Sequence, residues 1–358
     1  MKLEKNIPLK EYNTFAVDVS AKYFAKVESV EDIQELLTID ELKSQKWFIL
    51  GRGSNTLFTQ DFDGLVLKVE LMGKEVASQD SNEVIVDIGA GEDWPEFVMW
   101  AVEQGWSGVE NMAYIPGTVG AAPVQNIAAY GQSFDQICVS VEVVNRKTGG
   151  VETFTAEQCD FAYRSSAFKG SLRDKYIVTK VRMRLSKEAH FDTSYHSRKP
   201  NESLEKWLEE TAERPYTPKD VATAVTKLRQ FKLPLLSEYG TCGSFFTNPF
   251  VPVSKFHELS EKINELQQYP TTKMDYGRHD WKDTGDDEIV KIPAGRLLEE
   301  QGWKGKWVGN VGTFKEHSLV IVTNKEATGK EIYDFAMQMK ESVKKAYDIE
   351  LRSEVEIV

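Results

Sequence analysis

Cysteine and histidine are scarce in this sequence of 358 residues, and neither is spaced to bind zinc. Cys138, Cys159 and Cys242 form no CxxC pair, and the five histidines form no HxxxH or HxH pair. We therefore expect no metal site. Low cysteine usage of this kind is typical of proteins in a reducing compartment.

Long apolar runs and basic blocks are also missing. No stretch approaches the ~18 to 20 apolar residues of a membrane-spanning helix, and the start, MKLEKNIPLKEYNTF, lacks the apolar segment of a secretion signal. The 44 Lys and Arg are outnumbered by 56 Asp and Glu, which gives a net charge of −12. We expect a cytoplasmic protein that contacts neither membrane nor nucleic acid.

The usual glycine-rich nucleotide motifs are absent as well. There is no GxxxxGK[ST], and a GxGxxG pattern starting at Gly51 would need a glycine where Thr56 stands. A doubly wound dinucleotide fold and a P-loop are therefore disfavoured. The loop Gly51-Arg52-Gly53-Ser54-Asn55 still follows a strand-like run, so its N–H groups suit either a pyrophosphate or an ordinary tight turn.

The composition that is present belongs to an ordered globular protein: 41% of the residues are apolar and 28% are charged. The length predicts two or three domains. Strand-like and helix-like segments mix along the chain, which favours an α+β fold. The expected strands lie at 47–50, 65–69, 84–91, 137–144, 151–156, 176–185, 319–323 and 349–357.

Helix signals are clear at several places. A helix over 93–104 has Pro95 in its first turn and Gly105 at its end, with an apolar stripe at Phe97, Val98, Ala101 and Val102. A second helix opens with Thr217-Pro218, with a stripe at Val221, Val225, Leu228 and Phe231. Further helices are expected at 254–267, at 294–301 and after Thr328. The polar stretch 196–216 before the second helix marks a domain boundary, with one short helix of its own.

Three segments have residues that suit a ligand. The run IPGTVGAAPVQNIAAYG at 115–131 bunches glycines, prolines and amides without any periodicity, which fits either a ligand-lining loop or a buried crossover. Arg164 stands among aromatic and hydroxyl residues that can hold a guanidinium for anion recognition. Ser244 lies in GTCGSFFTNP, where Phe246 replaces the second glycine of a GxSxG elbow, so a hydrolase nucleophile is disfavoured.

Taken in order, these segments resemble the UDP-N-acetylenolpyruvylglucosamine reductases, a family of bacterial enzymes. Any one motif is weak, but eight in this order over nearly the whole chain are specific. They are YNTF at 13–16, GRGSNTLF at 51–58, the run from Gly108 to Gly131, FAYRSSAFK at 161–169, KLP at 232–234, GSFFTNP at 243–249, AGRLLEEQGWKG at 294–305 and the final SEVEI.

The resemblance implies an FAD-binding fold of the vanillyl-alcohol-oxidase type in two subdomains, 1–70 and 71–216, followed by an α+β substrate-binding domain, 217–358. It also implies noncovalent FAD, NADPH as reductant, and UDP-N-acetylglucosamine enolpyruvate as the substrate that is reduced to UDP-N-acetylmuramate. The product belongs to peptidoglycan precursor synthesis, and hence to cell wall biogenesis, cell shape and cell division. A cytoplasmic monomer is expected.

The resemblance also implies site residues. Arg164 matches the arginine that pairs with charge developing on the substrate, Ser244 the proton donor, and Glu354 a glutamate that assists in its protonated form. The positions that match FAD-binding residues are Gly53, Ser54, Asn55, Ile115, Pro116, Gly117, Gly120, Gln125, Asn126 and Arg229. The positions that match substrate-binding residues are Tyr195, Lys232 and Asn248.

The sequence departs from the family pattern in a few places. Phe314 and His317 stand where His and Gln are familiar, and Glu356 stands where an arginine is familiar. Residues 196–203 look like an insertion directly after Tyr195. Two alternatives stay open: another flavin oxidoreductase on the same fold, and a nucleotide-sugar binding protein without turnover.

Overall fold

The computed structural model describes residues 1–193, 203–269, 271–272, 275 and 288–358. Its contacts divide the chain into two compact units. Unit 1 comprises Met1–Ile7, Ala21–Arg52 and Asp63–Phe231, and unit 2 comprises Pro8–Ser20, Gly53–Phe62 and Lys232–Val358. The chain therefore enters unit 2 three times, and one crossing falls inside the glycine loop, between Arg52 and Gly53.

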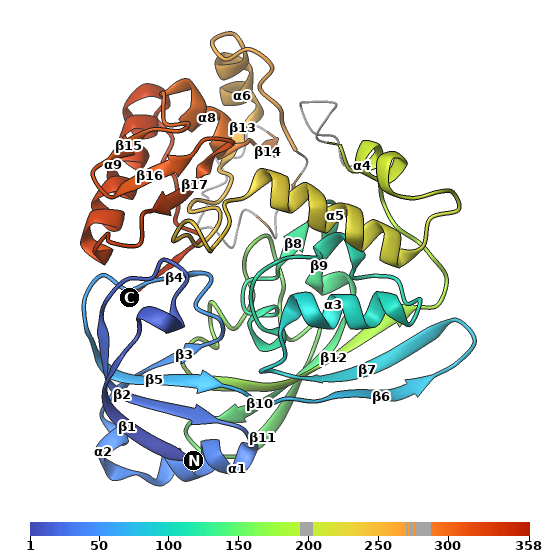
Figure 1. Ribbon diagram of the computed structural model, residues 1–358, viewed down its shortest axis with the longest axis vertical. Coiled ribbons are helices and arrows are strands. Elements are labelled where there is room, and N and C mark those ends of the chain that lie inside the picture. Colours follow the sequence, from blue (N-terminus) through green and yellow to red (C-terminus); the bar gives the residue numbers. More distant parts are fainter. Residues whose placement is uncertain (194–202, 270, 273–274, 276–287) are drawn as a thin grey trace. The chain divides into compact units, whose positions relative to one another are not determined.

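The described residues of unit 1 are built around two large sheets (Figure 1). The four-stranded sheet has the order β1 (Lys2–Pro8), β2 (Ser20–Val27), β5 (Phe62–Val69) and β3 (Lys46–Leu50), with β3 parallel to β5. The five-stranded antiparallel sheet has the order β11 (Val151–Thr155), β10 (Cys138–Asn145), β12 (Tyr176–Ser186), β7 (Glu83–Gly89) and β6 (Lys74–Gln79).

Alternating burial explains why these strands form. Along β12, every second residue from Ile177 to Leu185 is buried, so one face of the strand joins the core. Helix α3 (Trp94–Glu103) buries Trp94 and its predicted apolar stripe in the same core. A fully buried side chain of this size contributes about 2 to 3 kcal/mol of hydrophobic stabilisation. The smaller core under the other sheet is covered by α1 (Val30–Thr38) and α2 (Asp40–Lys43).

Helix α5 (Pro218–Lys232) belongs to unit 1, which runs to Phe231. Val221 and Val225 pack in the core of the five-stranded sheet, together with the short helix α4 (Leu204–Thr211) that was expected before it. The bounds of these two units therefore differ from those of the predicted subdomains, 1–70 and 71–216, and of the predicted substrate-binding domain, 217–358. Phe231 is 53% exposed, so its assignment to the apolar stripe was wrong.

Unit 2 combines short sheets with several helices in the described residues. A sheet of β15 (Trp307–Val308), β16 (Val311–Phe314) and β17 (His317–Thr323) lies against α8 (Ala294–Glu300) and α9 (Gly329–Tyr347). A second sheet pairs β13 (Phe250–Pro252) with β14 (Ile289–Lys291), next to α6 (Val253–Ser260). Helix α6 is shorter than the expected 254–267.

The end of the chain differs from the predicted strand over 349–357. The only regular strand there is β18 (Glu356–Ile357), which pairs in parallel with β4 (Thr56–Leu57). Before it, Ser353 makes a single bridge to Phe246 and Lys340 pairs with Glu350, so this stretch is held by separate contacts. Within the described residues, no helix is long and apolar enough to cross a membrane.

Candidate active site

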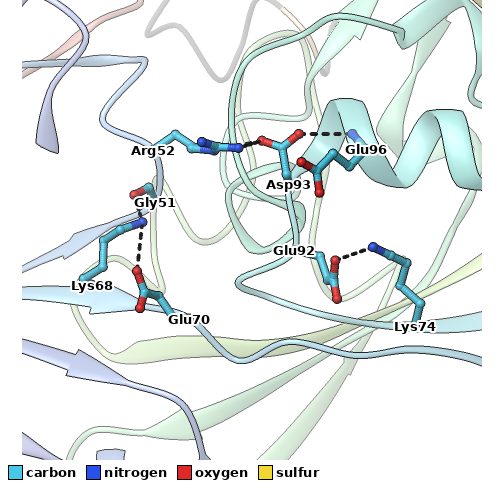
Figure 2. Close-up of polar contacts among 8 residues, drawn as sticks. All are labelled: Gly51, Arg52, Lys68, Glu70, Lys74, Glu92, Asp93 and Glu96. Carbon is cyan, nitrogen blue, oxygen red and sulfur yellow. Dashed lines mark hydrogen bonds and ion pairs between the residues drawn. The ribbon is translucent and has the colours of Figure 1, made fainter. Parts of the chain in front are cut away.

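The first half of the glycine loop is tied to the start of α3 (Figure 2). Lys68 Nζ donates to the Gly51 carbonyl at 2.7 Å, and Arg52 Nε donates to Asp93 Oδ2 at 2.8 Å. Asp93 is also the N-cap of α3, because its Oδ1 accepts from Glu96 N–H at 3.0 Å. Burial lowers the pKa of the Lys68 ammonium. Arg52 therefore has a structural ion pair.

The predicted cofactor segment lies beside this loop within unit 1. Its backbone is held on both sides, since Trp94 N–H donates to Gly117 O at 3.0 Å and Gly120 N–H to Ala90 O at 2.9 Å. A Cβ added at Gly51 would stand 2.9 Å from Thr118 Oγ1, and one added at Gly120 would stand 2.6 Å from Ala90 Cβ. Glycine at both positions is explained by close packing. Ile115 and Pro116 lie at the start of the same segment.

The far end of the segment is linked to the hairpin that carries Arg164. Asn126 is 6% exposed, accepts from Asp135 N–H at 3.0 Å, and donates from Nδ2 to Ala162 O at 3.2 Å. Gln125 beside it is half-buried. Arg164 has a φ of 50° between the mutual backbone bonds of Ala162 and Ser165, and its Nη2 donates to Ala128 O at 3.2 Å.

A second guanidinium lies near Arg164. Arg229 on α5 is half-buried, and its Nε donates to Tyr114 O at 3.2 Å. Burial lowers the pKa of Arg229, and the positive charge of Arg164 acts in the same direction, whereas Tyr130 and Tyr114 oppose it. No carboxylate of the described residues acts on this arginine. Two mutually repelling guanidinium groups beside a glycine-rich segment suit an anionic ligand that carries phosphates.

Ser244 and Glu354 come together in unit 2. Glu354 N–H donates to Phe245 O at 2.8 Å, and Ser244 bridges to Val320 on β17. Asn55 joins them, because its Nδ2 donates to Glu354 O at 3.1 Å. The three side chains are half-buried. Two predicted catalytic residues and one predicted cofactor residue thus occupy adjoining segments.

Gly53 and Cys242 next to this group have structural roles. Gly53 has a φ of +64°, and an added Cβ would stand 2.1 Å from Tyr12 O, so only glycine fits. The Cys242 Sγ lies 3.2 Å from Thr56 O and 3.5 Å from Thr14 Oγ1. Burial raises the pKa of the Cys242 thiol to about 12, which makes it an inert filler. Ser54 is half-buried.

Relatives that align over the full length decide the family. The chain is 39% identical over 359 residues to the UDP-N-acetylenolpyruvoylglucosamine reductase of Flavobacterium johnsoniae, and the alignment covers 100% of both chains. The chain belongs to the UDP-N-acetylenolpyruvoylglucosamine reductase family. The reductase of Pseudomonas aeruginosa is 33% identical over 99% of this chain and 98% of its own.

Domain models and a solved structure agree with the reductase family. An FAD binding domain matches residues 21–155, and the C-terminal domain of UDP-N-acetylenolpyruvoylglucosamine reductase matches residues 235–358. The crystal structure of the reductase from Thermus caldophilus has a TM-score of 0.65 at 22% identity, and covers 100% of this chain and 99% of its own. The predicted family and its α+β fold with an FAD-binding domain are confirmed.

Other positions taken from the reductase family have mixed surroundings. Asn248 Oδ1 accepts from Ala294 N–H at 3.0 Å, so it holds the start of α8. Lys232 is half-buried at the end of α5, and Tyr195 lies outside the described residues. Phe314 packs its ring 6.1 Å from Tyr239, and Glu356 donates its N–H to Asn55 O at 2.9 Å. The roles of all the predicted site residues stay predictions.

Sequence reasoning missed a buried polar cluster beside the cofactor segment. Glu110 and Asn111 are 0% exposed and connect to Gln132. The sequence signal that could have revealed this cluster is a carboxylate next to an amide in an otherwise apolar stretch, inside a motif shared with the reductase family. Burial of these groups arises from tertiary packing and is not visible in local periodicity.

Proposed function

We propose that this protein is a UDP-N-acetylenolpyruvoylglucosamine reductase that uses NADPH and noncovalent FAD to convert the enolpyruvyl ether of its UDP-sugar substrate into the lactyl ether of UDP-N-acetylmuramate. The observation that carries the proposal is the 39% identity over the full length of a reductase with this name. When bound, FAD supplies a hydride that originates from NADPH.

The residues of unit 1 fit the anionic groups of this reaction. Arg164 stabilises the negative charge that develops on the substrate next to its carboxylate, because a fixed guanidinium stabilises an anion strongly in a partly buried site. Arg229 balances the negative charge of the cofactor. The remaining FAD contacts are assigned to residues 53–55 and to the segment from Ile115 to Asn126.

The residues of unit 2 complete the reduction. The Ser244 hydroxyl donates a proton to the carbon that becomes carbanionic, and Glu354 assists at the same centre. Lys232 and Asn248 of this unit bind the UDP-sugar, with Lys232 opposite the diphosphate, and Tyr195, which lies outside the described residues, is assigned to the same ligand. The ranges 1–70 and 71–216 are assigned to cofactor binding and the range 217–358 to substrate binding.

Half-reaction kinetics test this division of roles. Ser244→Ala is expected to keep the flavin spectrum and the bleaching by NADPH, whereas reoxidation by the enolpyruvyl UDP-sugar slows by about 10² to 10⁴. Arg164→Met is expected to slow the same step by about 10² to 10³. Ser237→Ala is the control for Ser244→Ala, because Ser237 is an exposed serine of unit 2. A wild-type protein that binds the UDP-sugar but consumes no NADPH would instead be a binding protein.

In the cell, we place this activity in the cytoplasm, as a monomer, in the synthesis of peptidoglycan precursors. Depletion of the protein is then expected to disturb cell shape and division through the cell wall. Light scattering during size exclusion tests the monomer. A dimer at micromolar concentration would contradict that part of the proposal.

A further inference from the structure

A buried carboxylate anchors the start of the cofactor segment in unit 1. Glu110 is 0% exposed, and it accepts from Gly108 N–H at 2.6 Å, Val109 N–H at 3.0 Å and Ser107 Oγ at 3.0 Å. Its fourth partner is Gln132 Nε2, at 2.9 Å. A buried carboxylate is tolerated only when its lone pairs are satisfied in this way, so its partners are held firmly.

Gln132 connects this buried carboxylate to a tight hairpin. Its Oε1 accepts from Asn111 N–H at 2.9 Å, and Asn111 Nδ2 donates to Tyr130 O at 2.7 Å and to Asp192 O at 2.8 Å. The hairpin joins β8 (Ala128–Ala129) to β9 (Gln132–Ser133). Three buried or half-buried side chains therefore fix the turn from inside the protein.

The turn itself needs such support. Tyr130 has a φ of 48° and Gly131 a φ of 85°, which is the left-handed pair of a type I′ hairpin. Glycine adopts this conformation freely, but a tyrosine does so at a steric cost. Asn111 holds the strained residue directly, through the Tyr130 carbonyl.

Two predicted site arginines, Arg164 and Arg229, contact this hairpin. Arg164 Nη2 donates to the Ala128 carbonyl at 3.2 Å, and the Tyr130 side chain forms a hydrogen bond with Arg229. A shift of the turn would therefore move both the carbonyl that accepts from Arg164 and the tyrosine side chain that is bonded to Arg229. Misplacement of a positioning contact by about 1 Å is enough to slow catalysis.

We propose that Glu110, Gln132 and Asn111 are positioning residues that set the 128–133 hairpin, and through it Arg164 and Arg229, for reduction of the substrate and binding of the cofactor. This inference rests on the proposed function. It assigns no contact with substrate or FAD to the three residues themselves.

Gln132→Met tests the relay in the holoenzyme, because methionine has a similar length but makes neither hydrogen bond. We expect a kcat about ten-fold lower with an unchanged KM for NADPH, and an FAD dissociation constant about ten-fold higher in a titration of the apoprotein. Gln104→Met is the matched control, since Gln104 is exposed at the end of α3 and lies outside both the relay and the hairpin.

Two readouts separate positioning from general stability. Amide hydrogen exchange is expected to rise at least ten-fold over residues 126–134 and to stay unchanged in β10 and β12. In the double variant Gln132→Met with Arg164→Met, kcat is expected to equal that of Arg164→Met alone, because Gln132 acts on kcat through Arg164. If Gln132→Met does not fold, the same kinetic and exchange measurements are made on Asn111→Ser.

The outcomes distinguish this inference from the proposed function. A wild-type enzyme without turnover would overturn the proposed function. Normal turnover together with an unchanged Gln132→Met, additive losses in the double variant, or faster exchange throughout unit 1 would each overturn the positioning role.

Discussion

Asp93 connects the glycine loop to α3, and its replacement tests how unit 1 holds this loop. Its carboxylate caps the helix at Glu96 N–H and pairs with Arg52. The Asp93 side chain is 13% exposed and that of Arg52 is 52% exposed. Asp93→Ala removes both contacts, whereas Asp93→Asn keeps a capping oxygen and loses only the charge.

The magnitudes follow from these exposures. Loss of an N-cap costs about 1 kcal/mol. An ion pair whose arginine is half-exposed contributes about 0.5 kcal/mol, because solvent screens it. The free energy of unfolding should therefore fall by about 1.5 kcal/mol in Asp93→Ala and by about 0.5 kcal/mol in both Asp93→Asn and Arg52→Met.

Urea unfolding, followed by far-UV circular dichroism and tryptophan fluorescence, measures these changes in the transition of unit 1. Glu103→Gln is the control, since it removes only an exposed ion pair with Lys219 at the other end of α3. If Asp93→Asn were as unstable as Asp93→Ala, charge and not capping would dominate, and the reasoning would be refuted. A coupling free energy between Arg52 and Asp93 well above 1 kcal/mol would refute it equally.

Two further predictions concern stability. Gly53→Ala should lower the unfolding free energy of unit 2 by more than about 2 kcal/mol, because the new Cβ would meet the Tyr12 carbonyl. Gly309 also has a positive φ but has open space around it, so Gly309→Ala should cost only about 1 kcal/mol. Thermal melts of the two variants measure this difference. Asp87 accepts two bonds of 2.7 Å from Arg182, and these chiefly lower the pKa of its carboxyl. The stabilisation is then present above the unfolded pKa of about 3.9 and is lost as the pH falls through the lower folded pKa. Asp87→Asn should cost about 1 to 2 kcal/mol at pH 7, and this cost should shrink steadily as the pH falls below about 3.9; a difference that stays constant with pH would contradict this.

Local signals predicted the elements that depend on local interactions. Helix α3 forms within the expected range 93–104, and Thr328 caps α9 as expected; the structure adds that Asp93 caps α3 and that Glu331 completes a capping box with Thr328. These features need only neighbouring residues. The predicted strand over 349–357 formed only in part, because alternation alone does not provide a partner along its whole length and pairing depends on distant residues.

The candidate site was predictable to a similar degree. The family that the motifs indicated is confirmed, whereas the roles that they assign to Arg164, Ser244 and Glu354 stay predictions. They did not indicate that Gly120 is small because Ala90 lies against it, or that Glu110 is buried. Both facts follow from contacts between segments far apart in the chain, which no periodicity encodes.

The discontinuous course of unit 2 has a consequence for biosynthesis. Strand β4, Thr56–Leu57, pairs with β18, which lies 300 residues further along the chain, and Thr59 N–H donates to Val358 O at 2.8 Å. At about 5 to 20 residues per second, the ribosome needs roughly 15 to 60 s to make the partner strand. The edge at residues 56–57 stays unpaired for that time while unit 1, complete at Phe231, is free to fold. Closure of unit 2 thus waits until residues 356–358 have been made.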